Sequence, residues 1–234
     1  MGKNNTGYFY KDHPKTCAPK DFWGQVKRTV NNKPVSDEQI DMIVHAVTTI
    51  LDLGANDTVL DLCCGNGALS THFFSPCRQG LGVDFSDYLI QVAKENFEFP
   101  PKSVFILQNV MEYVHNEPVP ERFTKAVIYG SFQYLPFRSA QRLLQELRSR
   151  FTGIQTVFMG NLPDKEKIHI FYQGRKFDPT VVNDPSSPIG IWRSRSEVVN
   201  LAATAGWDVT FHTMPGAYYA ASYRFDAVLT PIAS

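Results

Sequence analysis

The stretch that decides the fold of this 234-residue chain is VLDLCCGNGALS at residues 59–70. It opens as an apolar run containing the β-branched Val59, which is typical of a buried strand, and then passes through a turn of small residues into a predicted helix. A glycine turn lets the backbone approach a ligand closely, and a helix N-terminus presents N–H groups without intrahelical partners. The stretch therefore predicts a strand–turn–helix unit that binds a ligand.

A second acidic residue, Asp84, ends the next short apolar run, at residues 81–83. It follows Asp61 at a spacing of ~20 residues, which is typical of a carboxylate that follows the second strand and meets the ribose hydroxyls of a bound nucleoside. An ionised carboxylate can accept hydrogen bonds from both hydroxyls. A glycine turn without a ligand is the alternative, and the position of Asp84 disfavours it.

These residues resemble the cofactor site of the class I S-adenosylmethionine-dependent methyltransferases. The resemblance rests on VLDLCCGNGALS followed by GVDFS at residues 82–86, and the order of motifs continues from about residue 37 to the end. The family usually has an acidic residue followed by Gly-x-Gly-x-Gly. Here Cys63 stands at the first glycine, so Gly65 and Gly67 carry the turn. A dinucleotide-binding Rossmann unit is the rival interpretation, but Ser70 stands where its third glycine is needed.

Alternating strand and helix patterns predict an α/β fold with a doubly wound, mainly parallel sheet and helices on both faces. The predicted strands are residues 58–62, 80–84, 104–107, 126–129, 155–159, 207–212 and 224–229. By resemblance to the family, the last two form the antiparallel hairpin that ends a seven-stranded sheet. Two capping boxes, Ser36 with Gln39 and Ser194 with Glu197, predict helix starts, and Gly54 is expected to end the first of these helices.

The chain divides into two predicted parts. Residues 37–234 are the S-adenosylmethionine-binding methyltransferase domain, and residues 161–192 within it are a polar, proline-rich insertion on the substrate side. Residues 1–36 are basic, with aromatic residues interleaved, and we predict a lid over the cofactor or over a small anionic substrate. An N-terminal extension that merely packs by its aromatic residues is an equal alternative, and nucleic-acid binding is a third.

Composition narrows the class of protein. The formal net charge is zero and 43% of the residues are hydrophobic, so the chain can form a core but offers no overall electrostatic attraction to nucleic acid. No apolar run approaches the ~20 residues of a membrane span. Four cysteines fit no zinc template, and no carboxylate cluster suggests a metal. We expect a cytoplasmic enzyme without metal or membrane contact, and the oligomeric state is left open.

The resemblance assigns cofactor-binding roles at the strand ends. Asp61, Cys63, Gly65 and Gly67 are expected to shape the loop under the amino-acid end of S-adenosyl-L-methionine, and Asp84 to bind its ribose. Phe85 is expected to pack against the adenine, and Asn109 and Val110 to lie at the adenine amino group. Tyr129 and Gly130 are expected near the methyl group. From the N-terminal segment the candidates are Trp23 and Arg28, with Arg28 paired to the cofactor carboxylate.

Methyl transfer is an in-line displacement in which the protein chiefly aligns the nucleophile, and a hydroxyl nucleophile benefits from a general base. The catalytic candidates are His169, in the insertion, and Tyr134, after the fourth strand, although a solvated or structural role is the common one for any histidine. No Asn/Asp-Pro-Pro-Tyr/Phe motif follows the fourth strand, which disfavours amino-methylation of adenine, cytosine or glutamine.

We therefore expect O-methylation of a hydroxyl or carboxyl group on a small molecule. The basic N-terminal segment favours an anionic acceptor such as a nucleotide-linked sugar. The alternatives are an RNA or protein methyltransferase, or a protein that binds an S-adenosyl compound without methylating anything.

Overall fold

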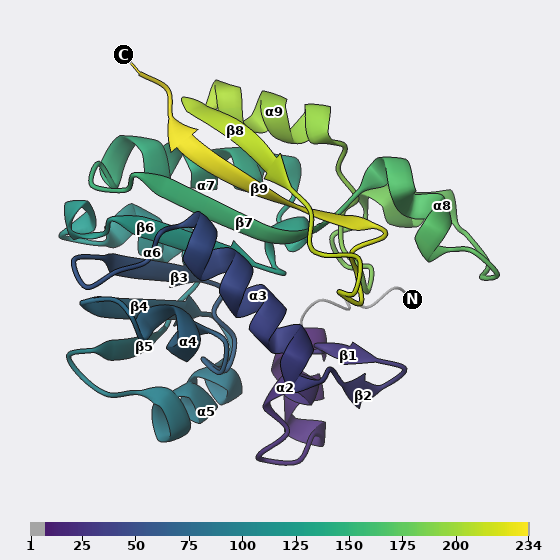
Figure 1. Cartoon of the computed structure of the whole chain (residues 1–234), viewed down its shortest axis with the longest axis horizontal. Helices are drawn as coiled ribbons and strands as arrows, with labels where there is room; N and C mark the ends of the chain where they lie inside the picture. The colour runs from purple at the N-terminus through teal and green to yellow at the C-terminus, as the bar shows by residue number, and fades with distance from the viewer. Residues whose placement is uncertain (1–7, 234) are drawn as a thin grey trace.

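The computed structural model describes residues 8–233 of the chain, so residues 1–7 of the predicted lid lie outside the described part. The described residues form a seven-stranded sheet with helices on both faces and an N-terminal segment (residues 8–36) beside one end of the sheet (Figure 1). This arrangement confirms the predicted α/β class.

The strand order is β5-β4-β3-β6-β7-β9-β8. Within the sheet, the first strand along the chain is β3, near the middle. The chain then adds β4 and β5 on one side of β3 and crosses back to place β6 on its other side. Parallel pairs join the first five strands, whereas β9 is antiparallel to both β7 and β8, as predicted for the C-terminal hairpin. Their bounds are β3 Thr58–Leu62, β4 Gln79–Asp84, β5 Ser103–Leu107, β6 Lys125–Tyr129, β7 Thr156–Pro163, β8 Trp207–His212 and β9 Arg224–Pro231. The reversal between β3 and β6 creates a crevice at the carboxyl ends of the strands, where such sheets bind ligands.

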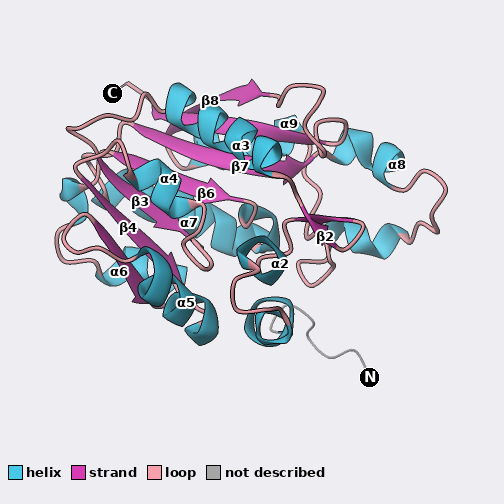
Figure 2. Ribbon diagram, turned by 60° about the horizontal axis from the view of Figure 1, so that its bottom comes forward, coloured by secondary structure: helices cyan, strands magenta, loops and turns pink. Residues whose placement is uncertain are grey.

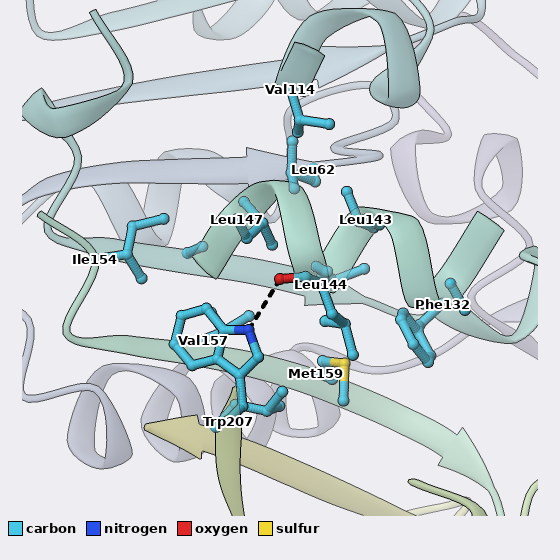
Figure 3. Packing of buried hydrophobic residues seen from close by; sticks show 14 of the residues in the cluster. Leu62, Val114, Phe132, Leu143, Leu144, Leu147, Ile154, Val157, Met159 and Trp207 are labelled. Carbon is cyan, nitrogen blue, oxygen red and sulfur yellow. Dashed lines mark hydrogen bonds between the residues drawn. The ribbon is translucent and has the colours of Figure 1, made fainter. Parts of the chain in front are cut away.

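Two layers of helices bury the two faces of the sheet. One face packs against α3 (Asp37–Ile50), α4 (Ser70–Phe74) and α5 (Asp87–Phe97), and the other packs against α6 (Val110–Asn116), α7 (Phe137–Arg150) and α9 (Arg195–Thr204). In the second layer the indole Nε1 of Trp207 donates a hydrogen bond to the carbonyl oxygen of Leu144 at 2.9 Å, so this large side chain is buried without an unpaired donor (Figure 3).

The N-terminal segment has its own short elements. After a π-helix (η1, Tyr8–Asp12) and a 3₁₀ helix (η2, His13–Thr16) come α2 (Phe22–Gln25) and a hairpin of β1 (Thr29–Val30) and β2 (Lys33–Pro34). Asn31 and Asn32 form the hairpin turn with φ of 51° and 60°. Asparagine tolerates this left-handed conformation better than most residues, which explains why the chain turns there.

The predicted insertion begins later than expected, because β7 continues to Pro163. Its register with β9 shifts between Met159 and Leu162, and pairing then resumes. Beyond it lie η5 (Lys165–Lys167), α8 (Ile168–Phe171) and η6 (Pro179–Asn183). The rings of Phe171, Trp192 and Tyr223 pack together and hold this region against β9. Figure 2 shows α8 beyond the end of the sheet.

The predicted helix start at Ser36 is confirmed, but its capping box is absent and Gly54 does not end the helix. Ser36 precedes α3, but its side chain makes no capping bond; the Gln39 side chain instead bonds Ala217 and Tyr219, about 180 residues away in sequence. The helix ends at Ile50, before Gly54, and Asp52 takes the left-handed conformation with φ of 49°. The capping box before α9 is present as predicted.

Candidate functional site

A cavity of about 330 Å³ lies at the carboxyl ends of β3, β4 and β6, where the strand order reverses. All but two of the predicted cofactor residues line it: Arg28, Asp61, Cys63, Gly65, Asp84, Phe85, Asn109, Val110, Tyr129 and Gly130. The exceptions are Trp23 and Gly67. The remaining wall includes Tyr10, Val26 and Asn66, which the sequence analysis did not single out.

The turn after β3 alternates left-handed residues. Cys63, Gly65 and Gly67 have φ of 63°, 61° and 76°. Cys63 therefore takes the conformation that the family's glycine would take, although its side chain makes this conformation costly. The backbone nitrogen of Cys63 donates to the carbonyl oxygen of Val83 at 2.8 Å, which fixes the turn to β4.

Gly67 packs tightly beneath the turn and does not line the cavity. A Cβ atom there would lie 2.8 Å from the Phe105 ring and 3.0 Å from the Cβ of Ala93. Only glycine lets this segment pack so closely against β5 and α5. Gly67 is therefore required beneath the turn, and the structure does not bring it to the cavity.

Asp84 is buried and both its carboxylate oxygens face backbone donors. Oδ2 accepts from the backbone nitrogen of Gly65 and Oδ1 from that of Ser86, both at 2.9 Å. Burial raises the pKa of Asp84, and backbone hydrogen bonds from Ser86, Gly65 and Phe85 oppose the rise. An ionised carboxylate has about four acceptor positions, so Asp84 can still accept from a ligand in the cavity that it lines.

Asp61 lies deeper, beneath the turn. The Ser70 hydroxyl donates to its Oδ2 at 2.5 Å. Burial raises the pKa of Asp61 to about 7, and the negative charge of Asp84 adds to the rise. The Ser70 hydrogen bond and the positive charge of Arg28 both oppose it. A ligand cation in the cavity would favour the ionised form of this carboxyl group.

Arg28 reaches the cavity from the N-terminal segment. Its guanidinium lies 5.4 Å from the centre of the Tyr129 ring and 5.6 Å from that of Trp23. Within residues 8–233 no carboxylate lies at ion-pair distance from it. Trp23 does not line the cavity, and its ring lies against the Arg28 guanidinium.

The far end of the cavity is formed by Phe85, Asn109 and Val110. The Oδ1 of Asn109 accepts from the backbone nitrogen of Met111 at 2.9 Å and caps α6. The carbonyl predicted to face an adenine amino group is therefore already a helix cap, with one lone pair left. Phe85 is exposed, and the Lys11 ammonium lies 5.4 Å from the centre of its ring.

Two side chains of the main domain hold the N-terminal segment over the cavity. The Asn66 amide nitrogen donates to the carbonyl oxygen of Phe22 and to Oε1 of Gln25, at 2.8 and 2.9 Å. Ser86 stands at the N-cap position of α5, but its hydroxyl makes no capping bond and donates to the carbonyl oxygen of Tyr10 at 2.6 Å. Asn66 lies inside the predicted glycine turn, but nothing local indicated which segment it would bind.

The structure separates the two catalytic candidates. Tyr134 lines the cavity, where its ring meets that of Tyr10 edge to face at 5.2 Å, and its hydroxyl donates to the carbonyl oxygen of Pro188 at 2.9 Å. His169 lies on α8, exposed and outside the cavity, because α8 turns Phe171 toward the aromatic cluster and leaves His169 facing outward. The prediction that His169 belongs to the site is not supported by its position.

No three His, Cys, Asp or Glu side chains within residues 8–233 come together as metal ligands would. No helix in the same range combines the length and apolar character that crossing a membrane requires.

Residues 59–151 match a family model described as a methyltransferase domain. An uncharacterized methyltransferase of Schizosaccharomyces pombe is 31% identical over 77 residues, which are 33% of this chain and 28% of that protein. A 23S rRNA (uracil(1939)-C(5))-methyltransferase of Aliivibrio fischeri is 38% identical over 81 residues, which are 35% of this chain and 16% of that protein. The chain thus spans less than a third of the length of these two curated relatives.

A solved structure matches over nearly the full length. The magnesium protoporphyrin IX methyltransferase of Synechocystis PCC 6803, solved with bound S-adenosylmethionine, superposes with a TM-score of 0.61 and 13% sequence identity. The match covers 99% of this chain and 98% of that one. At this identity the likeness establishes a shared fold.

Proposed function

Because residues 59–151 are a class I, S-adenosylmethionine-dependent methyltransferase domain, we propose that this chain transfers the methyl group of S-adenosylmethionine to a carboxyl or hydroxyl oxygen of a small molecule. The N-terminal segment closes the cofactor cavity, and residues 161–192 border the acceptor. The observation that carries the proposal is the pattern of hydrogen bonds around Asp84.

The polar groups of the cavity fit the cofactor at two places. Asp84 lines the cavity and has acceptor capacity beyond its backbone hydrogen bonds, which suits the neighbouring hydroxyls of a ribose. Asp61 and Arg28 present opposite charges, and Arg28 reduces the pKa rise of Asp61. An amino-acid group carries an ammonium and a carboxylate, so Asp61 would pair with the first and Arg28 with the second.

When bound, the cofactor supplies a methyl carbon activated by a positively charged sulfur. The chain contributes alignment and exclusion of water. Gly130, with φ of 71°, lets the backbone approach the reacting atoms without a side chain. Tyr10 and Tyr134 form the wall on this side, and the segment carrying Tyr10 is tied down through Ser86.

No histidine lines the cavity in the part of the chain that the structure describes, Asp61 is assigned to the ammonium, and the Tyr134 hydroxyl donates to Pro188, which favours a carboxyl oxygen as the acceptor atom. A carboxylate is already ionised at neutral pH and needs no general base, whereas an alcohol does. Of the two acceptor groups proposed for O-methylation, we therefore favour the carboxyl group over the hydroxyl group.

An RNA acceptor is the second candidate, since a curated relative carries an rRNA methyltransferase name. The zero net charge of the chain weighs against it. Binding of RNA and binding of a small molecule differ in salt dependence, because each phosphate that the protein neutralises adds to the slope of log affinity against log salt concentration. Steeply salt-dependent RNA binding would support the second candidate.

Calorimetry with S-adenosylhomocysteine tests the cofactor site. We expect Asp84→Ala to lower its affinity about 10- to 100-fold, since two hydrogen bonds to a carboxylate are lost. Asp208→Ala is the control, because Asp208 is exposed on β8 and does not line the cavity. Equal affinity in wild type and Asp84→Ala would overturn the ribose assignment.

The acceptor is found by mixing the enzyme and S-adenosylmethionine with metabolite fractions separated by charge, and measuring S-adenosylhomocysteine release. The proposal expects release with the acidic fraction. Release only with RNA or protein fractions would contradict it.

A further inference from the structure

Arg224 begins β9, on the acceptor side of the sheet, and is only partly committed to the fold. One of its nitrogens, Nη1, donates to the carbonyl oxygen of Asn161 at 2.5 Å, and its guanidinium lies 5.4 Å from the centre of the Tyr223 ring. The Arg224 side chain also hydrogen-bonds that of Tyr223. A guanidinium has five N–H donors, so some of them are left for other partners.

Arg193, in the same region, is an arginine whose terminal nitrogens are both used by the fold. It is buried, and its two terminal nitrogens donate to the carbonyl oxygens of Phe132 and Leu135 at 3.4 and 2.5 Å. These bonds hold the turn that carries Tyr134. Arg224 makes one such bond only, and its other donors are not used by backbone oxygens in the described part of the chain.

The carboxylate nearest to Arg224 in sequence, Asp226, does not form an ion pair with it. Asp226 is buried, and its Oδ1 accepts from the backbone nitrogen of Asn161 at 2.7 Å. It influences Arg224 electrostatically, but the two lie outside ion-pair distance. The positive charge therefore lacks a carboxylate at contact distance within residues 8–233.

Several tyrosine side chains lie near enough to this charge to interact with it. Those of Tyr134, Tyr219 and Tyr223 interact electrostatically with Arg224, and Tyr10 does so as well. Tyr10 and Tyr134 also line the cofactor cavity. Arg224 itself does not line the cavity, but its Nη1 bond to the Asn161 carbonyl oxygen and its interaction with two wall residues place the guanidinium behind that wall, close to hydroxyl groups that can donate to an anion.

Asn161 connects this charge to the methyl-transfer point. It sits at the irregularity of β7 in the left-handed conformation, with φ of 64°, and its buried Oδ1 lacks a hydrogen-bond partner. Its amide nitrogen lies 3.7 Å from where a Cβ of Gly130 would be, and Gly130 lines the cavity. Bulges and left-handed residues of this kind are common beside active sites, where they aim side chains.

We propose that Arg224 binds an anionic group of the methyl acceptor, a carboxylate or a phosphate, and that Oδ1 of Asn161 accepts a hydrogen bond from the same molecule. The inference rests on the proposed function and specifies its substrate class. The planar guanidinium fork matches either anion with two parallel N–H donors. The nearby tyrosine rings suit an acceptor with a flat apolar part next to the anion.

Binding of three small probes to the full chain saturated with S-adenosylhomocysteine tests this. Benzoate and phenyl phosphate carry the two anions, and benzamide is the neutral analogue of benzoate. We expect at least one anion to bind and benzamide to bind at least about tenfold more weakly, since charge-assisted bonds are lost. The stronger anion identifies the acceptor group as carboxylate or phosphate.

Three variants assign the binding to Arg224. Arg224→Gln should weaken the bound anion at least about tenfold, and Arg224→Lys, which keeps the charge without the fork, should fall between it and wild type. Arg175→Gln is the matched control, because Arg175 also stacks on an aromatic ring, that of Phe171 at 4.8 Å, but lies outside the cavity. Unchanged S-adenosylhomocysteine affinity in Arg224→Gln shows that the variant is folded.

The proposal is wrong if Arg224→Gln binds the anions as tightly as wild type, or if neither anion binds while S-adenosylhomocysteine does. Failure of S-adenosylhomocysteine to bind the wild type is a different result, because it overturns the proposed function itself.

Discussion

The Oδ2 atom of Asp84, at the end of β4, lies 2.9 Å from the backbone nitrogen of Gly65, in the turn after β3. One carboxylate thus shapes the glycine turn and remains able to accept from a ligand. Because Gly65 has a left-handed φ of 61°, its N–H points at the neighbouring strand end. The turn and the acidic residue form one unit, and four predictions concern the parts around it.

Gly67→Ala should destabilise the protein by about 1–3 kcal/mol, because its Cβ would lie 2.8 Å from the Phe105 ring and its φ is left-handed. Urea unfolding measures this. Gly54→Ala is the control: nothing lies within 4 Å of its added Cβ, and stability should stay the same or rise. Equal losses in both variants would contradict the packing role.

Asp61→Asn should remove a pH-dependent loss of stability. Burial raises the pKa of Asp61 to about 7, so the folded protein holds this proton to a higher pH than the unfolded chain does, whose value is about 3.9. The unfolding free energy of the wild type therefore falls as pH rises from about 4 to about 7, and the variant should lack this contribution. Parallel pH profiles for the two proteins, from denaturant titrations without ligand, would refute it.

Arg28→Gln should lower the affinity for S-adenosylhomocysteine about tenfold or more, because a charge-assisted pair with the carboxylate is lost. Its affinity for methylthioadenosine, which lacks the amino-acid group, should equal that of the wild type. Calorimetry with both ligands distinguishes the loss of the pair with the carboxylate from a general loss of cofactor binding. Equal losses for both ligands would mean that Arg28 acts through the fold of the N-terminal segment.

Asn66→Ala should loosen the N-terminal segment. The variant loses the bonds to Phe22 and Gln25 and leaves the buried Gln25 amide oxygen without this donor, at a cost of about 1–3 kcal/mol. We expect faster tryptic cleavage between residues 11 and 33. Asn96→Ala is the control, since Asn96 makes its amide bond within α5. Unchanged cleavage in Asn66→Ala would show that other contacts hold the segment closed.

Local patterns were enough for the order of strands and helices and for the main cofactor loop. The bounds of β3 and β8 agree with the prediction, because runs of apolar residues and the breaks between them are properties of neighbouring residues. The capping box at Ser194 and Glu197 was equally predictable, since both of its bonds close within three residues.

Features that depend on contacts between distant segments could not be predicted in this way. Gln39 had the spacing of a capping box, but a loop about 180 residues later takes its side chain. Ser86 likewise binds Tyr10 instead of capping its own helix. In both cases a tertiary partner competes with the local one, and sequence spacing describes only the local one.

The sequence by itself determined the sheet, the turn after β3 and the two acidic residues at the strand ends, because each follows from hydrophobic periodicity and the special conformations of glycine. Only the tertiary structure decided that Gly67 packs beneath the turn, that His169 faces outward and that Arg224 stands beside the cavity wall. These outcomes depend on which surfaces meet when the chain closes, and burial is a property of the whole fold.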